Sequence, residues 1–127
     1  MYFAVKAALA DPAAEKFSFD EEALHGGKKI EVGDEVYIFA SDQGGGKGLC
    51  AKGEVTAAKA GSDSHMSIEV KRTAQARFPL GREELKSHGE SQEEGAEAEL
   101  AQKLYQQGTD KISGISELTA AFLDGFF

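Results

Sequence analysis

The pattern of apolar and polar side chains predicts a chain built mainly from β-strands. Residues Glu35–Ala40 are β-branched, aromatic or small at nearly every position, which is typical of a strand covered on both faces. Leu49–Ala58 instead alternates apolar with polar residues, as does the segment at residues 66–70, and this indicates strands with one buried face. A glycine-rich segment at residues 41–48 separates the first two strands, so they are predicted to form a hairpin.

Two shorter strands and several short helices complete the predicted order of elements. The strands lie at residues 2–6 and 111–115. Helices are predicted to begin where a capping residue precedes helix-forming residues, at Asp11, Asp20, Ser91 and Ser116. The second of them, residues 20–25, ends before two glycines. The last helix is predicted to bury Leu118, Phe122 and Leu123.

The length and the order of these elements predict one domain, residues 1–127. The strands recur at hairpin spacing, without a regular alternation of strand and helix. The expected fold class is therefore α+β: a small, mostly antiparallel β-barrel with short helices inserted between its strands.

The charge of the chain is unevenly distributed. Fourteen lysines and arginines stand against 22 acidic residues, and a net charge of -8 argues against a protein that coats nucleic acid with its whole surface. Residues 83–99 hold seven acidic residues and one lysine, so a single segment, interpreted as a solvated helix face, carries most of the excess. Residues 59–82 are locally basic, so a pocket helped by a few cations remains compatible with the acidic total.

The cysteine and histidine content limits the chemistry that is expected. One cysteine excludes an internal disulfide, and three scattered histidines lack the spacing of metal ligands, so no metal and no cofactor are expected. The apolar runs are far shorter than the ~20 residues of a membrane span, and the first residues do not resemble a signal peptide. A cytoplasmic location without membrane contact is the expectation, and the sequence does not define the oligomeric state.

Two local patterns carry candidate chemistry, and for each the simpler interpretation is favoured. The glycine-rich segment is not a phosphate loop, because Lys47 is followed by Gly48 and a strand rather than by Ser or Thr and a helix. It is interpreted as a hairpin loop, with Lys47 as a candidate phosphate contact. Lys52 and Glu54 share one face of a strand and form a candidate acid–base pair, but a solvent-exposed ion pattern is favoured. No residue is assigned a catalytic role.

The order of several short motifs resembles a known family. Val32–Ser41 reads V-G-D-E-V-Y-I-F-A-S, and after a glycine-containing loop Gly48–Val55 reads G-L-C-A-K-G-E-V. A strand leading to an Arg/Phe/Pro segment follows, and K-I-S-G-I-S-E-L at Lys111–Leu118 completes the pattern. In this order the chain resembles the EVE and ASCH-type domains of the PUA-like superfamily over most of its length.

The resemblance implies a β-barrel with a cavity beside its first and second strands. In EVE and the related YTH domains, this cavity accepts a flipped, modified nucleobase. The positions that match the family's ligand contacts are Lys6, Ala7, Phe39, Ser41 and Asp42. Phe39 would stack on a base, and the two polar residues that follow it would contact the base edge.

The chain also departs from the family pattern at these positions. EVE domains usually have a Trp in the first strand and a K-S-E-P run after it, whereas this chain has no Trp and continues from Lys6 with two alanines. An alanine follows Phe39 where the family usually has an aromatic–His pair. Lys47 and Arg72 are added as the expected phosphate contacts, because phosphate groups are bound by basic side chains.

These observations favour a non-enzymatic binding module with a pocket for a nucleobase, modified or not, or for a nucleotide-like ligand. The expected partner is a nucleic acid or nucleoside bound at that single pocket. One alternative is a small amidohydrolase of N-acylated nucleosides that uses Lys52 or Lys6 with Glu54. The other is a protein-interaction module that uses an acidic helix at residues 93–99 and an exposed Phe126–Phe127 tail.

Overall fold

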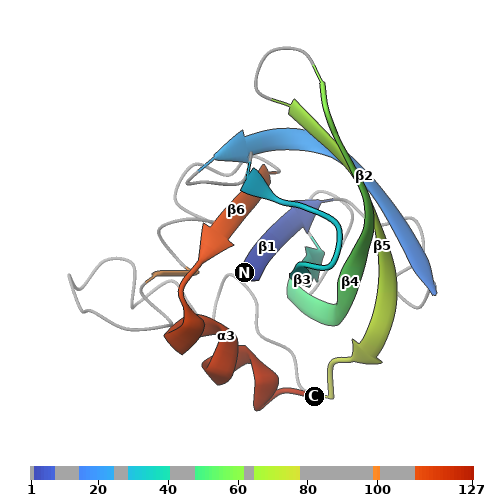
Figure 1. Ribbon diagram of the computed structural model, residues 1–127. Helices are drawn as coiled ribbons and strands as arrows, with labels where there is room; N and C mark the ends of the chain where they lie inside the picture. Colours follow the sequence, from blue (N-terminus) through green and yellow to red (C-terminus); the bar gives the residue numbers. More distant parts are fainter. Residues whose placement is uncertain are drawn as a thin grey trace.

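Six strands and a C-terminal helix make up the described part of the computed structural model, which covers residues 2–7, 15–24, 29–40, 48–61, 65–77, 99–100 and 111–127. The elements are β1 (Tyr2–Ala7), β2 (Lys16–Leu24), β3 (Glu35–Ala40), β4 (Gly48–Ala60), β5 (His65–Gln75), β6 (Lys111–Ile115) and α3 (Glu117–Asp124). The strands curve around a common axis, and α3 lies near the N-terminal end of β1 (Figure 1).

The strands close into a barrel in the order β1–β3–β4–β5–β2–β6. The neighbours β1–β6, β3–β4, β4–β5 and β2–β5 are antiparallel, whereas β1–β3 and β2–β6 are parallel. Closure pairs the outermost strands with each other, so these strands present no open edge. The predicted fold class, a small and mostly antiparallel barrel of α+β type, is confirmed.

Side chains fill the interior of the barrel. Phe3 and Val5 point inward from β1, and Val36 and Ile38 point inward from β3, all fully buried. The other strands add Phe17, Phe19, Ala23, Ala51, Val55, Met66, Ile68, Val70 and Ile112. Because the interior of a small barrel is just wide enough for its own side chains, a ligand is expected to bind on the outer face.

A second apolar cluster covers the outer face of β1 and β3. Tyr37 and Phe39 point outward, opposite Val36 and Ile38, as predicted for a strand that is buried on both faces. This outer cluster also contains Ala4, Leu49, Leu100, Ile115, Ala120 and Leu123. The central strand of the hairpin therefore contributes to both cores of the molecule.

Helix α3 begins and ends where the sequence predicts, but not all of its predicted contacts form. The Ser116 side chain accepts a hydrogen bond from the Thr119 backbone N–H at 3.3 Å, which is the expected N-cap interaction, and Gly125 is the C-cap. Leu123 is fully buried, whereas Leu118 is 68% exposed. The prediction for Leu118 is wrong because its position lies on the side of the helix that faces away from the barrel.

The Gly33–Asp34 turn leads the chain into β3. Gly33 has a φ of +95°, a left-handed conformation that glycine adopts at little cost. The Asp34 carboxylate accepts a hydrogen bond from the Glu31 N–H at 2.9 Å. The Gly33 N–H donates to the Val55 carbonyl and the Val55 N–H donates to the Asp34 carbonyl, both at 2.9 Å. The G-D motif therefore joins the start of β3 to β4.

Gly53 allows β4 and β5 to approach closely. A Cβ atom at this position would lie 2.6 Å from Val70 Cγ1 and even nearer to the Lys71 carbonyl oxygen. The register between the two strands also shifts between Lys52 and Gly53. A side chain at Gly53 would therefore force the strands apart.

A β-bulge changes the predicted faces of β4. The register against β3 shifts so that Leu49 lies opposite Phe39, whereas Ala51 lies opposite Ile38. Leu49 and Ala51, predicted to share one face, consequently pack in the outer and inner clusters. Cys50 lies between them, donates its S–H to the Ile38 carbonyl at 3.4 Å, and has its pKa raised to about 11 by burial.

The prediction of a helix at residues 20–25 is wrong, because β2 extends through Leu24. Phe17, Phe19 and Ala23 point into the barrel, and pairing with β5 and β6 outweighs the helix propensity of the acidic segment. The helices predicted from Asp11 and Ser91 lie outside the described residues, apart from residues 99–100, which are helical. Within the described ranges, no helix is both long and apolar enough to cross a membrane.

Candidate ligand-binding site

Four side chains lie in a row across neighbouring strands. Lys6 of β1 pairs with Phe39 of β3 on one side and with Lys111 of β6 on the other, and Lys111 in turn pairs with Glu22 of β2. Side chains at directly opposed positions of antiparallel strands have Cβ atoms about 4.5–5.5 Å apart, so the two lysines are immediate neighbours. Phe39, Lys6, Lys111 and Glu22 are called the cross-strand row below.

The cross-strand row belongs to the outer face of the barrel. Val5 and Ala7, on either side of Lys6, point into the interior cluster, as does Ile112 beside Lys111. Because side chains alternate along a strand, the two lysines point outward. Lys6 lies near the C-terminal end of β1, which points away from α3 in Figure 1. Lys6 therefore lies toward the end of β1 that points away from the helix, whereas Phe39 packs in the outer cluster to which the helix contributes.

Both lysines of the row are buried although they face outward. Lys6 is 3% exposed and Lys111 is 1% exposed, and Phe39 beside them is fully buried. Removing an ammonium group from water is costly, and like charges at directly opposed positions add to that cost. Arrangements of this kind are concentrated at functional sites, where stability is exchanged for chemistry.

The environment of Lys111 disfavours its charged form. Burial lowers the pKa of Lys111 below its ordinary value, and the negative charge of Glu22 opposes this effect without reversing it. Glu22 is exposed, so the residue whose charge acts on the buried amine is in contact with the solvent. The row thus combines an aromatic ring, two buried basic groups and one acidic group that contacts water.

The structure brings together two of the residues predicted from the sequence, Lys6 and Phe39. In this conformation the Phe39 ring is part of the outer cluster. Ala7 points into the interior, so only its backbone is available to a ligand. Arg72 is not part of this group, because two strands separate β5 from β1 in either direction around the barrel. The predicted residues Ser41, Asp42 and Lys47 lie outside the described part of the chain.

The residue that the sequence analysis missed is Lys111. Its strand is predicted correctly, but a lysine at the first position of a short strand resembles an ordinary solvent-exposed end. Its neighbours Lys6 and Glu22 belong to β1 and β2, so its surroundings depend on pairings between segments far apart in the sequence. One feature of the sequence agrees with their pairing: Lys6 lies near the end of its strand and Lys111 lies at the start of its strand, and antiparallel pairing places these two ends side by side.

A second polar group, called the helix clasp, joins α3 to the barrel. The Tyr37 hydroxyl donates to Asp124 Oδ1 at 2.7 Å and lies 3.2 Å from the Ala120 carbonyl oxygen. Lys52 Nζ donates to the same Asp124 oxygen at 3.0 Å and lies 3.5 Å from Glu35 Oε1. The clasp consists of Tyr37, Lys52, Asp124 and Glu35. It links the last turn of α3 to β3 and β4.

Burial and hydrogen bonding shift the pKa values of Tyr37, Asp124 and Lys52 in the helix clasp. Burial raises the pKa of Tyr37, and the hydrogen bond to Asp124 raises it further, so the phenol remains a donor. Burial also raises the pKa of Asp124, but hydrogen bonds from Tyr37 and Lys52 outweigh it, and the net pKa is lowered. Burial lowers the pKa of Lys52, and Asp124 and Glu35 reverse the effect, so the net pKa is raised.

The acid–base pair considered from the sequence, Lys52 with Glu54, is not what the structure assembles. The Lys52 ammonium group is bound by Asp124 and Glu35, whereas Glu54 is exposed. Although Lys52 and Glu54 lie on one strand face, the helix that packs beside this face supplies the nearer carboxylate. Lys52 therefore serves to fasten α3 to the barrel.

The expectation of an exposed phenylalanine tail is also wrong. Phe127 and Tyr37 have ring centres 6.1 Å apart, and Lys52 Nζ lies 5.2 Å from the centre of the Phe127 ring. The Phe126 carbonyl accepts a hydrogen bond from the Arg77 N–H at 2.6 Å. Both phenylalanines are half-buried against the outer cluster, so this end of the chain is part of the fold.

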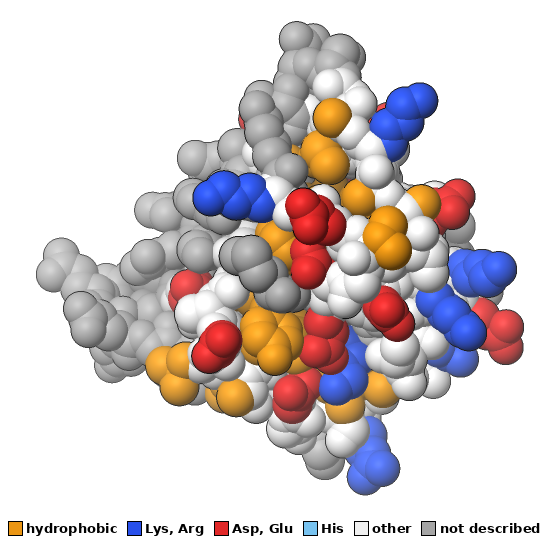
Figure 2. All heavy atoms as spheres, in the orientation of Figure 1, with side chains coloured by type: hydrophobic (Ala, Val, Ile, Leu, Met, Phe, Trp, Pro, Cys, Tyr) orange, Lys and Arg blue, Asp and Glu red, His pale blue; other side chains and the backbone are white. Residues whose placement is uncertain are grey.

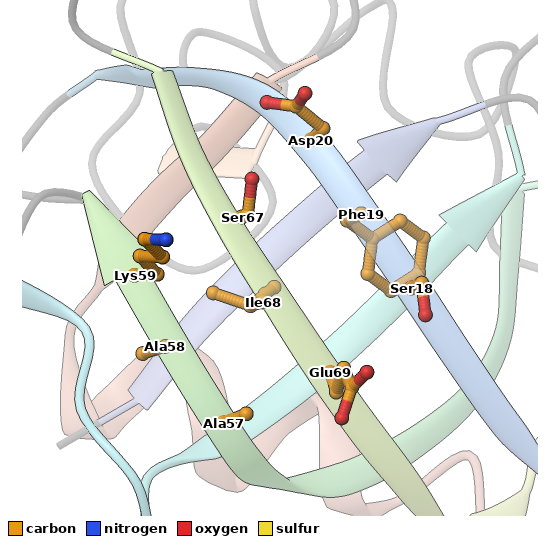
Figure 3. A pocket seen from close by; sticks show the side chains of 9 residues that line it. All are labelled: Ser18, Phe19, Asp20, Ala57, Ala58, Lys59, Ser67, Ile68 and Glu69. Carbon is orange, nitrogen blue, oxygen red and sulfur yellow. The ribbon is translucent and has the colours of Figure 1, made fainter. Parts of the chain in front are cut away.

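A hollow of about 390 Å³ lies over β2, β4 and β5 (Figure 3). Its lining consists of three cross-strand rows: Asp20–Ser67–Lys59, Phe19–Ile68–Ala58 and Ser18–Glu69–Ala57. An apolar middle row thus lies between two polar rows that together contain two carboxylates and one ammonium group. This charge balance is unfavourable for a phosphate group, and none of these residues was selected from the sequence.

Across the described ranges, no cluster of three His, Cys, Asp or Glu side chains could hold a metal ion.

This chain resembles known proteins in its three-dimensional structure but not detectably in its sequence. No protein-family model and no curated protein sequence matches it. A crystal structure of a Pseudomonas putida protein superimposes with a TM-score of 0.65 and 16% identity, covering 99% of both chains. Human THYN1, in complex with DNA that contains 5-methylcytosine, gives a TM-score of 0.65 and 10% identity, covering 95% of this chain and 94% of that one. A hypothetical protein from Leishmania major gives 0.63 and 17%, covering 98% and 92%.

Proposed function

We propose that this chain is a non-enzymatic module that binds a nucleobase or nucleotide at the cross-strand row. Its fold is that of the EVE-type domains of the PUA-like superfamily. The observation that carries the proposal is the pair of buried lysines, Lys6 and Lys111. A phosphate group or the acceptor-rich edge of a base would interact favourably with two basic groups at this spacing.

The solved neighbours support the proposal without identifying the ligand. Human THYN1 has the same fold, and its structure contains DNA with 5-methylcytosine. At 10% identity the individual contacts of that protein are not transferred to this chain. The support is that a protein with the same fold has been observed in complex with DNA.

The distribution of charge favours a local site over a broad basic surface. Figure 2 shows acidic side chains in the middle of one face of the molecule and several lysines and arginines along its right-hand edge. With a net charge of -8, the chain is not suited to binding that depends on neutralising many phosphates. A pocket that accepts one nucleotide needs only a few local cations.

Fluorescence anisotropy with short oligonucleotides tests the proposal. The probes carry cytosine or 5-methylcytosine at one position, and they are titrated at low salt because phosphate contacts weaken as salt rises. We expect saturable binding that Lys6→Met and Lys111→Met each weaken by about tenfold or more, equivalent to about 1.4 kcal/mol. Free nucleosides, titrated in parallel, show whether the polymer is required.

Two exposed lysines provide matched controls. Lys59→Met and Lys71→Met remove the same charge from β4 and β5, on the side of the barrel away from the row. Their affinities should remain within about twofold of the parent protein, because isolated exposed charges contribute little. Equal losses in all four variants would mean that binding depends only on net charge, and the absence of saturable binding to any probe would overturn the proposal.

A further inference from the structure

Lys111 has the properties of a nucleophilic amine. It is 1% exposed, it lies directly opposite Lys6 on the neighbouring strand, and burial lowers its pKa. A lysine attacks a carbonyl group only through its neutral form, and proteins increase the neutral fraction by removing the amine from water or by placing it next to another cation. The first condition is met at this position, because burial is what lowers the pKa of Lys111.

We propose that Lys111 forms an imine with an aldehyde group on a nucleotide bound at the cross-strand row. The inference rests on the proposed function for the nature of the ligand, and on the paired, buried lysines for its chemistry. Lys52 shows the contrast within the same outer face, because two carboxylates hold its amine in the protonated, non-nucleophilic form.

The reaction balances without an oxidant or a reductant. The lone pair of Lys111 Nζ forms a bond to the carbonyl carbon, and a proton moves from the nitrogen to the carbonyl oxygen to give a carbinolamine. The hydroxyl group then leaves as water, and the carbon–nitrogen double bond forms. Addition of water reverses the step and restores the free amine and the aldehyde.

Other members of the cross-strand row have roles that suit this reaction. Glu22 pairs with Lys111, its charge acts on Lys111, and its exposed carboxylate can exchange protons with the solvent. Lys6, on the other side, provides a donor for the oxygen of the aldehyde or for the phosphate group of the nucleotide. Phe39 completes the row with an apolar surface.

Aldehydes occur on nucleotides in two chemically similar forms. One is a formyl group on a base, as in 5-formylcytosine, and the other is the ring-opened sugar at an abasic site. Both present the same electrophilic carbon to an amine, so the chemistry of Lys111 does not distinguish them. The distance from the phosphate group to the aldehyde does differ, and oligonucleotides of each kind separate the two sources.

The first experiment measures the reactivity of the amine without any nucleotide. The native protein is treated near neutral pH with a small aromatic aldehyde and cyanoborohydride, which reduces each imine to a stable amine, and adducts are located by peptide mass spectrometry over a time course. We expect adduct to form on Lys111 about tenfold faster than on the exposed Lys59 and Lys71, because burial lowers the pKa of Lys111 and so increases its neutral fraction. Faster labelling of the exposed lysines would overturn the inference.

The second experiment uses oligonucleotides that carry 5-formylcytosine, an abasic site or 5-methylcytosine under the same reducing conditions. We expect a covalent complex through Lys111 with at least one of the two aldehydes, and none with 5-methylcytosine. If the aldehyde probes bind but form no adduct at Lys111, the inference fails while the proposed function stands. If the small aldehyde labels Lys111 but no oligonucleotide binds, the nucleotide assignment fails together with the proposed function.

Two substitutions separate nucleophilicity from charge. Lys111→Arg keeps a cation but removes the nucleophile, so it should abolish the covalent complex, and it should weaken non-covalent binding of the 5-methylcytosine probe less than Lys111→Met does. Lys111→Met should lose both, and Lys59→Met should lose neither. Retention of the covalent complex in Lys111→Arg would assign the reaction to another lysine and overturn the proposal.

Discussion

Lys52 and Lys111 occupy the same outer face of the barrel but have opposite surroundings. Lys52 lies with Asp124, Glu35 and the ring of Phe127, and its pKa is raised. Lys111 is buried opposite Lys6, and its pKa is lowered. A lysine that joins two elements is surrounded by carboxylates, which raise its pKa. A reactive lysine is buried away from water, which lowers its pKa. The two positions can therefore be distinguished by experiment.

The largest effect is expected from a change beside the clasp lysine. Gly53→Ala places a Cβ atom 2.6 Å from Val70 Cγ1, so β4 and β5 must separate and Lys52 must move with β4. Overpacking of this kind costs about 1–3 kcal/mol, and we expect the upper end of that range because backbone is also in the way. Urea unfolding measures the loss. Surface substitutions usually change the free energy of unfolding by less than about 0.5 kcal/mol. A loss no larger than this in Gly53→Ala would show that the two strands can separate freely.

Removing the phenol of the clasp is expected to have the next largest effect. Tyr37→Phe deletes the hydroxyl that donates to Asp124 and leaves the apolar packing of the ring in place. A hydrogen bond to a charged group contributes about 1.5–3 kcal/mol, and the half-exposed carboxylate places this one near the lower limit. Thermal unfolding should show a decrease of several degrees. Binding at the cross-strand row should be unchanged, since Tyr37 is not a member of the row and the substitution keeps its aromatic ring beside Phe39.

Asp124 should contribute a smaller and pH-dependent amount. The folded protein lowers the pKa of Asp124 from its ordinary value of 3.8, so its stabilisation is present above that pH and is lost as the pH falls through the folded value. Asp124→Asn should therefore cost about 1 kcal/mol near neutral pH, and this difference from the parent should shrink below about pH 4. Thermal melts over a pH series check this. A constant difference throughout would contradict a charge-dependent role.

The smallest effects should come from the lysines themselves, and their signs should differ. Lys52→Met removes an ion pair of a partly exposed group and should destabilise the protein by about 0.5–1 kcal/mol. Lys111→Met replaces a buried amine with an apolar chain of similar length and should leave stability unchanged or increase it slightly. Chemical denaturation of the two variants side by side provides the comparison. A clear loss of stability in Lys111→Met would indicate a structural role for this lysine.

Strands with a clear pattern of apolar side chains could be predicted from the sequence, whereas the strand at residues 16–24, which depends on long-range pairing, could not. Glu35–Ala40 and the alternation at residues 66–70 carry their own signal of burial. Residues 20–24 contain good helix formers, and only the pairing of β2 with β5 and β6 makes them a strand. Local propensity does not contain that information.

The candidate site was only half predictable for the same reason. Lys6 and Phe39 were found because they match positions of the family resemblance, but Lys111, the neighbour of Lys6 on β6, lies more than a hundred residues after Lys6 in the chain. The G-D and G-E-V motifs that carry the family resemblance proved to be structural, since they join the turn before β3 to Val55. Short motifs of this kind specify a fold, and the side chains that surround them determine a function.

The parallel contact between β2 and β6 has a consequence for motion. These strands pair through three residues, Glu22–Leu24 with Lys111–Ser113, whereas β2 pairs with β5 through seven. The shortest contact in a closed ring is where it should part most easily, so we expect amide hydrogens there to exchange faster than those of β3. Lys111 lies on this contact. Transient parting of β2 from β6 would separate Lys111 from Glu22, so the surroundings of the amine would change each time this contact opens.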